Sequence, residues 1–369
     1  MKSLLSLGVS LVVALLVASS TPAISVAQVL GLPDRSPAAS VYERVGVTDI
    51  KIKYHRPAVR DRQIWGNVVP YGLAPALGFF GNGKPYPWRA GANDNTTIYF
   101  EHDVLVEGQP LSAGKYALYM IPSESDWTVV FNEDHSSWGS FFYEEERDVL
   151  HVTVIPVEGP FQERMGFAFQ NQDDSGGVTI ALAWENLVVP FRVQVADYQQ
   201  TVLASLDAEL KGRPGLTPAS WAAAVNYCTR TAETDDICVA WADVAIQRNP
   251  GFNSQVAKAD LLRQRGDEVA SNEAIEAAMA SANENELNIY GYQLMQRGEI
   301  DRAIAVFTQN VERHPESWNV YDSLAEGYAN KGDAQRAITY YSKALEMVAD
   351  DGQKDRIRGA LSNLRGGTD

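Results

Sequence analysis

The sequence has 369 residues, of which 45% are hydrophobic and 21% are charged, an ordinary globular composition that excludes an intrinsically disordered or wholly membrane-embedded chain. At about 100–200 residues per domain, this length predicts two or three domains, each able to bury its own core. With 47 acidic residues against 31 Lys and Arg, the net charge is −16, so the averaged field repels phosphate backbones and we expect no nucleic-acid partner.

The N-terminus has the pattern of a secretory signal peptide. Lys2 precedes an apolar run over residues 4–17. Ser25-Val26-Ala27 then provides small residues at the two positions that a signal peptidase recognises before its cleavage site. The run is shorter than the roughly 20 residues that span a bilayer, which favours cleavage after Ala27 over an uncleaved membrane anchor. We predict a signal peptide over residues 1–27 and a periplasmic or secreted protein that has no membrane span after cleavage.

Residues 36–196 contain short runs of strand character separated by turn signals, after prolines at positions 33 and 37. The run 48–54 alternates apolar and polar residues, the period of a half-buried strand. The runs 115–121 and 127–131 flank a polar turn, which is typical of a hairpin. No stretch has the period of a helix, so we predict an antiparallel β-sandwich, with a barrel as the alternative. The other predicted strands are 97–101, 104–106, 149–155, 163–169, 178–184 and 187–195.

The composition and the periodicity of the sequence change near Asp197. Residues 198–210 form a helical pattern that Gly212 and Pro214 end, and we interpret residues 197–214 as a helical linker. From there Ala, Leu, Gln, Glu and Arg dominate with helical periodicity. The sequence therefore predicts an all-α region over residues 215–365.

This helical region repeats itself. Gly298 and Gly332 are 34 residues apart, and each is followed by matching acidic, small and aromatic residues. The pattern resembles the tetratricopeptide family over residues 284–349, and it is degenerate over the turn at Gly266 and over residues 221–248. The resemblance implies stacked helical hairpins that hold a protein or peptide partner.

Cys228 and Cys238 are the two cysteines of the chain. In an exported protein the default is a disulfide. The helical pattern places Cys228 near the end of one helix and Cys238 near the start of its antiparallel neighbour, at similar height. We predict that they are bonded; two free buried thiols are the alternative, and the spacing argues against a redox centre.

Catalytic signatures are nearly absent from the sequence. It contains no His-Glu-x-x-His, Gly-x-Ser-x-Gly or phosphate-binding glycine loop, so we predict no metal, no cofactor and no named catalytic residue. Residues 173–177 (DDSGG) echo a serine-protease motif but fit a turn better. A zinc site remains open as an alternative to solvated or hydrogen-bonded histidines. Its candidate ligands are His55, His102, His135 and His151 with Asp103, Glu133 or Asp134.

Several linked motifs resemble an exported bacterial family known as domain of unknown function 2911. They are HRP at 55–57, WRAGAN at 88–93, GKYALYMIP at 114–122, WTVVFN at 127–132 and WG at 138–139. The segment 73–87 is longer than this family's approach to the Trp-Arg motif, and Asp94 stands where Glu is expected. The resemblance implies the domain but no activity.

The aromatic and glycine-rich segment 79–95 is the most informative stretch for a binding site. Arginines beside aromatic rings can stack on them and bind carboxylates or sugar hydroxyls in a fork. The alternative is that the arginines clamp loops to the sheet through buried ion pairs. The candidate ligand-binding residues are Arg56, Arg62, Tyr86, Trp88, Arg89, Asn93 and Asn132.

These features lead to two hypotheses of function. The first is an exported, non-catalytic binding or scaffold protein, in which the helical repeats hold a protein or peptide and the β-domain holds a small ligand or glycan. The alternative is an extracytoplasmic hydrolase or carbohydrate-active enzyme with its site in the β-domain. A deep pocket around a strongly shifted carboxylate or histidine favours the enzyme, whereas a shallow aromatic surface favours binding.

Overall fold

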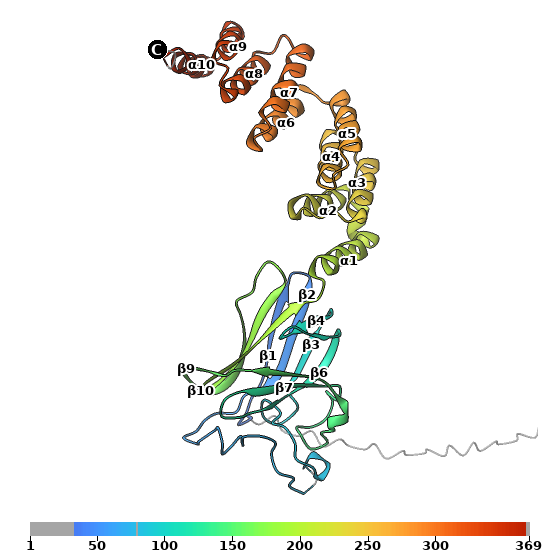
Figure 1. Ribbon diagram of the computed structural model, residues 1–369, viewed down its shortest axis with the longest axis vertical. Coiled ribbons are helices and arrows are strands. Elements are labelled where there is room, and N and C mark those ends of the chain that lie inside the picture. Colours follow the sequence, from blue (N-terminus) through green and yellow to red (C-terminus); the bar gives the residue numbers. More distant parts are fainter. Residues whose placement is uncertain (1–32, 79, 367–369) are drawn as a thin grey trace, which may run out of the picture. The chain divides into compact units, whose positions relative to one another are not determined.

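The computed structural model describes residues 33–78 and 80–366 (Figure 1). The signal peptide predicted for residues 1–27 lies outside the described residues. The chain divides between Gln194 and Val195 into two compact units, one of strands and one of helices.

The first unit contains two antiparallel sheets. Six strands form one sheet in the order β1-β2-β3-β6-β7-β8, and four form the other in the order β5-β4-β10-β9. The strands are β1 (Ala38–Val45), β2 (Thr48–His55), β3 (Thr97–Phe100), β4 (Val104–Val106), β5 (Gln109–Leu111), β6 (Gly114–Ile121), β7 (Trp127–Asn132), β8 (Asp148–Val154), β9 (Val157–Gln170) and β10 (Gly177–Val195).

The alternating pattern of the strands decides which face of each sheet is buried. In β2, Ile50 and Ile52 are buried while the intervening lysines are exposed, because successive side chains point to opposite faces. Rings from the two sheets meet in the core: the centroids of Tyr54 and Phe167 are 5.0 Å apart, and those of Phe131 and Phe191 are 6.3 Å apart. The predicted antiparallel sandwich is therefore confirmed.

The strand boundaries differ from the prediction at one place that has a clear cause. Residues 178–184 and 187–195 form a single long strand, β10, rather than two. Glu185 has a positive φ of 56°, and the register with β9 shifts on both sides of it. A β-bulge of this kind interrupts the alternating pattern without ending the strand. The prediction also missed the eight-residue strand β1 and the short edge strand β5, and β9 begins at Val157 rather than at residue 163.

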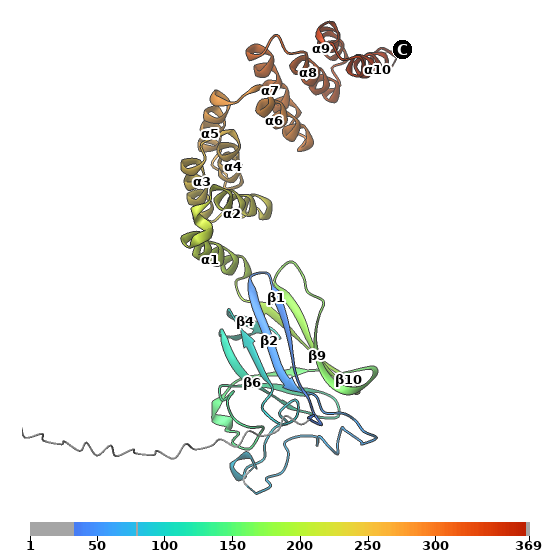
Figure 2. The ribbon, with the colours of Figure 1, turned by 180° about the vertical axis from the view of Figure 1, so that it is seen from behind.

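The second unit is a series of helical hairpins (Figures 1 and 2). Gly266, Gly298 and Gly332 end the first helix of three successive hairpins with φ near 80°, a conformation that glycine adopts without strain. The helices are α1 (Tyr198–Lys211), α2 (Pro218–Thr231), α3 (Asp236–Arg248), α4 (Phe252–Gln264), α5 (Glu268–Ser281), α6 (Glu284–Gln296), α7 (Ile300–Arg313), α8 (Trp318–Lys331), α9 (Ala334–Met347) and α10 (Asp351–Gly366).

An aspartate N-cap begins the second helix in two of these hairpins. Asp267 and Asp333 each follow a hairpin glycine, and their carboxylates accept a hydrogen bond from a backbone N–H of the next helix's first turn, at 3.1 Å in both cases. An N-cap of this type stabilises a helix by about 1 kcal/mol. The same Gly-Asp pair therefore ends one helix and begins the next, which confirms the tetratricopeptide-like hairpins.

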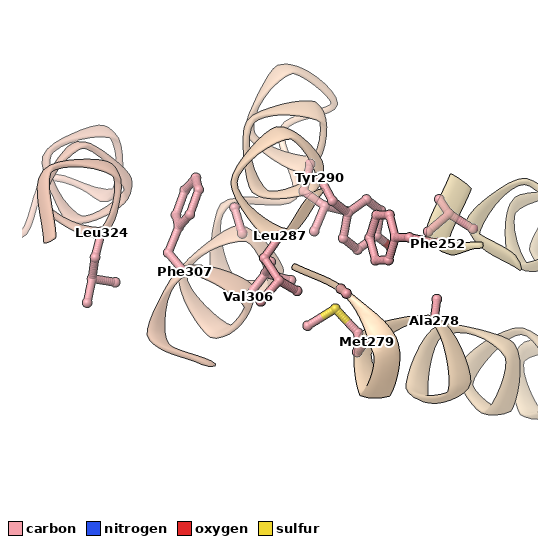
Figure 3. Packing of buried hydrophobic residues seen from close by; sticks show 12 residues of the cluster. Phe252, Ala278, Met279, Leu287, Tyr290, Val306, Phe307 and Leu324 are labelled. Carbon is pink, nitrogen blue, oxygen red and sulfur yellow. The ribbon is translucent and has the colours of Figure 1, made fainter. Parts of the chain in front are cut away.

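The hairpins stack through aromatic and small residues. Figure 3 shows Phe307 and Tyr290 in a cluster that continues to Phe252 on one side and Leu324 on the other. Phe307 packs against α6 at Gly291, where a Cβ would lie 2.3 Å from its ring. A glycine is required at this position because the ring occupies the space of a side chain.

The first helices of this unit form a separate core. Leu203 and Leu210 of α1, which the sequence suggested to be a linker, are buried with residues of α2 and α3. Cys228 and Cys238 lie in the same cluster and form a disulfide, with their Cα atoms 6.1 Å apart. The predicted disulfide is confirmed. Among the described residues, no helix has both the length and the apolar character needed to cross a membrane.

Candidate functional site

Two of the candidate arginines are used to hold backbone. Arg56 Nε donates to the carbonyl of Met165 at 2.8 Å, and Arg62 donates to the carbonyls of Val59 and Ala58 at 3.0 and 2.6 Å. The guanidinium carries five N–H donors, so it can satisfy several backbone carbonyls at once. These two arginines act as clamps, through carbonyls rather than through the carboxylates that we considered.

Asn132 also serves the fold. It is 1% exposed, and its Nδ2 donates to Glu144 O at 3.0 Å and to Asp148 Oδ1 at 2.7 Å, while its Oδ1 accepts from Asp134 N at 2.8 Å. Every polar atom of its side chain is thus engaged in tying the 133–147 loop to the sheet. The same carboxylate, Asp148, accepts from Tyr143 Oη at 2.5 Å, and burial together with this bond raises the pKa of Tyr143.

The aromatic pair of the candidate set lies in two different places. Trp88 is half-buried in a cluster of tryptophans, with its ring centroid 6.0 Å from that of Trp184, and its Nε1 donates to Gly91 O at 3.2 Å. Tyr86 stacks on Phe80 with centroids 6.0 Å apart.

Arg89 and Asn93 do come together. Arg89 Nη1 donates to Asn93 O at 2.8 Å, and the guanidinium carbon lies 5.4 Å from the ring centroid of Trp138. No carboxylate of the described residues lies within ion-pair distance of Arg89, and burial lowers its pKa. Asn93 Nδ2 in turn donates to Asp34 Oδ2 at 2.8 Å. Of the predicted set, these two residues form the one local group.

Next to this group lies a cavity of about 640 Å³, which we call the sheet-face groove. Its floor is the outward face of β1, β2, β3 and β6, and Trp138 with its preceding residues forms one side. The lining residues include Ser40, Lys53, His55, Asp94, Asn95, Thr97, Lys115, His135, Ser136, Ser137 and Trp138.

Sequence reasoning missed most of the sheet-face groove. Lys53, Thr97 and Lys115 are neighbours because Lys53 pairs with Thr97, and Lys115 pairs with the residue two positions along the same strand. Their outward positions follow from period-two alternation. Their proximity follows from the order β2-β3-β6, which no single run of the sequence reveals.

The histidines do not assemble a metal site in the structure. His55 and His135 line the sheet-face groove, while His151 in β8 hydrogen-bonds Asp148 at 2.8 Å. His102 lies in a bend between β3 and β4, where its ring hydrogen-bonds Thr48 at 3.1 Å. In the described part of the chain, no three His, Cys, Asp or Glu side chains are placed to hold a metal ion.

The 173–177 segment is a turn, as expected. Asp173 Oδ1 accepts from the backbone N–H and hydroxyl of Ser175 and from Gly177 N, and Arg192 pairs with the same carboxylate. These donors hold the pKa of Asp173 well below its usual range. The Ser175 hydroxyl is a donor to this turn and has no histidine partner, so it is not an activated nucleophile.

A second and larger cavity, of about 1180 Å³, lies in the helical unit. We call it the helical groove. It is lined by α2, α4 and α6, the first helices of successive hairpins, which occupy the same side of the unit (Figures 1 and 2). Its lining is rich in amides and in paired charges. The residues are Asn226, Thr229, Arg230, Asn253, Val256, Ala257, Asp260, Arg263, Gln264, Asn283, Asn285, Glu286, Ile289, Gln293, Arg297 and Glu299.

The charges of the helical groove are organised around Asp260. Arg297 donates to both carboxylate oxygens of Asp260, at 3.1 and 3.0 Å, and Arg263 donates to Oδ1 at 2.9 Å. Arg263 also lies 3.5 Å from Glu299. Bidentate pairing of this kind fixes the geometry of the side chains. Ile289 is 48% exposed beside them and supplies apolar surface.

Comparison with known proteins bears on the two units differently. Residues 36–193 match the family model described as Protein of unknown function (DUF2911). The sandwich is a DUF2911 domain. This confirms the resemblance inferred from the sequence motifs. No curated protein shows a significant match to the chain.

Three of the solved structures that resemble part of the chain each match 42–43% of it. They are pilF of Pseudomonas aeruginosa (16% identity, 42% of this chain and 69% of that chain, TM-score 0.27), MamA of Desulfovibrio magneticus RS-1 (13%, 42% and 84%, 0.26) and YrrB, a TPR protein with an unusual peptide-binding site (15%, 43% and 83%, 0.27). Because these identities and TM-scores are low, they carry no argument about this chain. The repeat assignment depends on the glycine-ended hairpins described above.

Proposed function

We propose that this protein is an exported, non-catalytic binding protein whose helical groove holds an extended segment of a partner protein. The observation that supports this most directly is the groove itself. It is about 1180 Å³ in volume and is lined by amide side chains from three successive hairpins.

The chemistry of the helical groove fits a peptide backbone. Each Asn side chain offers both donors and an acceptor, so a row of them can pair with the N–H and C=O groups of an extended chain. Asn226, Asn253 and Asn285 supply such groups from α2, α4 and α6. The paired arginines leave little net charge to select a strongly acidic or basic partner, while Ile289 adds an apolar contact.

The DUF2911 domain enters this proposal as a domain that binds a small ligand or glycan in the sheet-face groove. A hydrolase there would need a general acid and base in one cavity, commonly two carboxylates. Asp94 is the one carboxylate among the residues that line this groove. The hydroxyls of Ser136 and Ser137 donate to Asp134 rather than to a histidine. These contacts favour binding over catalysis.

The disulfide supports an extracytoplasmic location, because cytosolic thiols are kept reduced. Mass spectrometry of the protein from its native host should find a mature N-terminus at or near Gln28. A cytoplasmic protein that retains Met1 would contradict this part of the proposal.

Peptide binding can be tested with the intact protein. A display library of extended peptides is selected against it, and the affinity of the best peptide is measured by fluorescence polarisation. Replacing Asn253 and Asn285 together by Ala should weaken binding about tenfold or more, since each lost hydrogen bond costs roughly 1 kcal/mol.

Asn330→Ala is the matched control for this experiment. Asn330 is on α8, outside the helical groove, and its Nδ2 donates to Glu326 O within the same helix. The control should bind the selected peptide as the unchanged protein does. Equal affinity of the double variant, or a library that yields no peptide, would count against the helical groove as the binding site.

A further inference from the structure

We propose that the sheet-face groove binds an acidic saccharide, in which Lys53 and Lys115 contact carboxylates and Trp138 packs against a sugar ring. This rests on the ligand-binding function proposed above for the DUF2911 domain and names the class of that ligand. It involves no residue of the helical groove, so the two proposals can fail separately.

The charges of the sheet-face groove favour an anion. Lys53 and Lys115 line it from strands on either side of β3, and neither forms an ion pair with a carboxylate of the described residues. Asp94 is the one acidic residue of the lining. In a chain of net charge −16, most lysines have acidic neighbours, so two unpaired lysines in one cavity form a local cationic site.

The aromatic side of the groove favours a sugar ring over a small inorganic anion. Trp138 is 49% exposed, and its ring is held by the Arg89 guanidinium at 5.4 Å and by Phe141 at 4.8 Å. A ring fixed in this way offers an apolar surface at little cost in side-chain entropy. The C–H face of a pyranose is apolar and its edge carries hydroxyls, so it can pack on Trp138 and still face polar groups.

Polar groups for the hydroxyl edge lie beside the tryptophan. Asn95 lines the groove, and its Nδ2 donates to Tyr119 Oη at 2.9 Å, but its buried Oδ1 accepts no hydrogen bond from the described part of the chain. A buried acceptor of this kind needs a donor. A ligand hydroxyl supplies one, directly or through a single water molecule. Thr97, Ser136 and Ser137 add hydroxyls around it.

The probe for this proposal is trigalacturonate, which combines pyranose rings with a carboxylate on each. Isothermal titration of the intact, disulfide-bonded protein at low ionic strength should detect binding. Maltotriose, a neutral trisaccharide, should bind at least tenfold more weakly, and sodium sulfate should not compete at the concentrations of trigalacturonate used. Binding should weaken as salt is added, because both lysines are exposed to solvent and their attraction for an anion is screened.

Three lysine variants test the site residue by residue. Lys53→Gln and Lys115→Gln shorten the side chain by about one atom and remove its charge while keeping it polar, and each should weaken trigalacturonate binding roughly tenfold. Lys51→Gln is the matched control, because Lys51 is exposed on the same face of β2 but does not line the groove. Trp138→Ala should abolish binding, with unchanged circular dichroism showing that the domain is folded.

Several outcomes would overturn the proposal. If Lys51→Gln weakens binding as much as the other two variants, the attraction is diffuse and there is no site in the groove. If sulfate displaces trigalacturonate at the concentrations of trigalacturonate used, the groove binds anions in general and not a saccharide. The same conclusion follows if the Trp138→Ala variant binds trigalacturonate normally. A protein that binds its selected peptide but not trigalacturonate contradicts this inference alone, whereas loss of peptide binding alone contradicts the function of the helical groove.

Discussion

At the scale of single residues, burial of tyrosine hydroxyls in the helical unit couples stability to alkaline pH. Burial, together with the nearby carboxylates of Glu326 and Asp322, raises the pKa of Tyr341 to about 12. The same cause raises the pKa of Tyr292 above its usual range. Below pH 10 these groups are neutral in both the folded and the unfolded state, so they contribute no pH dependence there.

Above pH 10 the unfolded chain ionises its tyrosines while Tyr341 stays protonated in the fold, so the free energy of unfolding falls as pH rises. We expect Tyr341→Phe to remove this contribution. Urea unfolding should show similar stability for both proteins at pH 7, and at pH 12 an advantage for the variant of up to about 2 kcal/mol. Parallel losses of stability in the two proteins between pH 10 and 12 would contradict the expectation.

Gly291 shows how one missing side chain sets the fit of two helices. Gly291 lies in α6, where glycine costs about 1 kcal/mol of helix propensity relative to alanine. A Cβ there would lie 2.3 Å from Phe307 Cε1. Since Phe307 is fully buried and central to the stacked core, overpacking should outweigh the gain in propensity.

We therefore expect Gly291→Ala to lower the free energy of unfolding by about 1–3 kcal/mol. Gly359→Ala is the control: Gly359 is also within a helix, α10, but a Cβ there meets no atom within 4 Å. That substitution should raise stability by up to about 1 kcal/mol. Denaturant unfolding measures both free energies of unfolding. If the two substitutions change the free energy of unfolding in the same direction, the packing explanation is refuted.

At the scale of elements, the disulfide lies in the hairpin that has the weakest repeat pattern. It joins α2 to α3 across a sequence separation of 10 residues. Closing so short a loop restricts the unfolded chain by about 2–3 kcal/mol on the chain-entropy account. The buried Trp241 and Ala242 pack around it, so the bond adds to a core rather than replacing one.

Replacing Cys228 and Cys238 together by Ala should lower the unfolding free energy of the helical unit by about 2–3 kcal/mol. The cysteine-free variant should be insensitive to dithiothreitol, whereas the unchanged protein should lose a similar amount of stability on reduction. If reduction leaves the melting temperature unchanged, the bond does not contribute to stability as described.

At the scale of the whole molecule, the two units have separate cores, and we propose that each folds alone. The position of α1 makes this testable in detail. Leu203 and Leu210 of α1 are buried against α2 and α3, so a helical fragment should need this helix even though the sequence suggested a linker.

A fragment of residues 36–195 should give a β-type circular dichroism spectrum, and one of residues 197–366 a helical spectrum. A shorter fragment, 215–366, lacks α1 and should be less stable than 197–366, by about 3–6 kcal/mol for the lost burial of two leucines. Equal melting temperatures for the two helical fragments would show that α1 is a linker after all. A largely helical 36–195 fragment would contradict the separate cores.

The sequence by itself determined the features that depend on local patterns. Period-two alternation identified most of the strands, although not β1 or β5, and the glycines at the ends of helices identified the hairpins, because each is a property of a short segment. The disulfide was also predictable, since the two cysteines belong to adjacent helices of one hairpin. The DUF2911 motifs were readable as fixed runs of residues.

Only the tertiary structure decided how distant polar residues are used. Arg56, Arg62 and Asn132 looked like ligand-binding groups, but backbone carbonyls and a carboxylate occupy their donors. Arg56 reaches Met165, 109 residues away in the chain, whereas Arg62 bends back to Ala58 in its own loop. Lys53 and Lys115 gave no signal, because they become neighbours through the order of the strands. A polar side chain is available to a ligand only if the fold leaves it unsatisfied, and that depends on long-range pairing which local sequence does not contain.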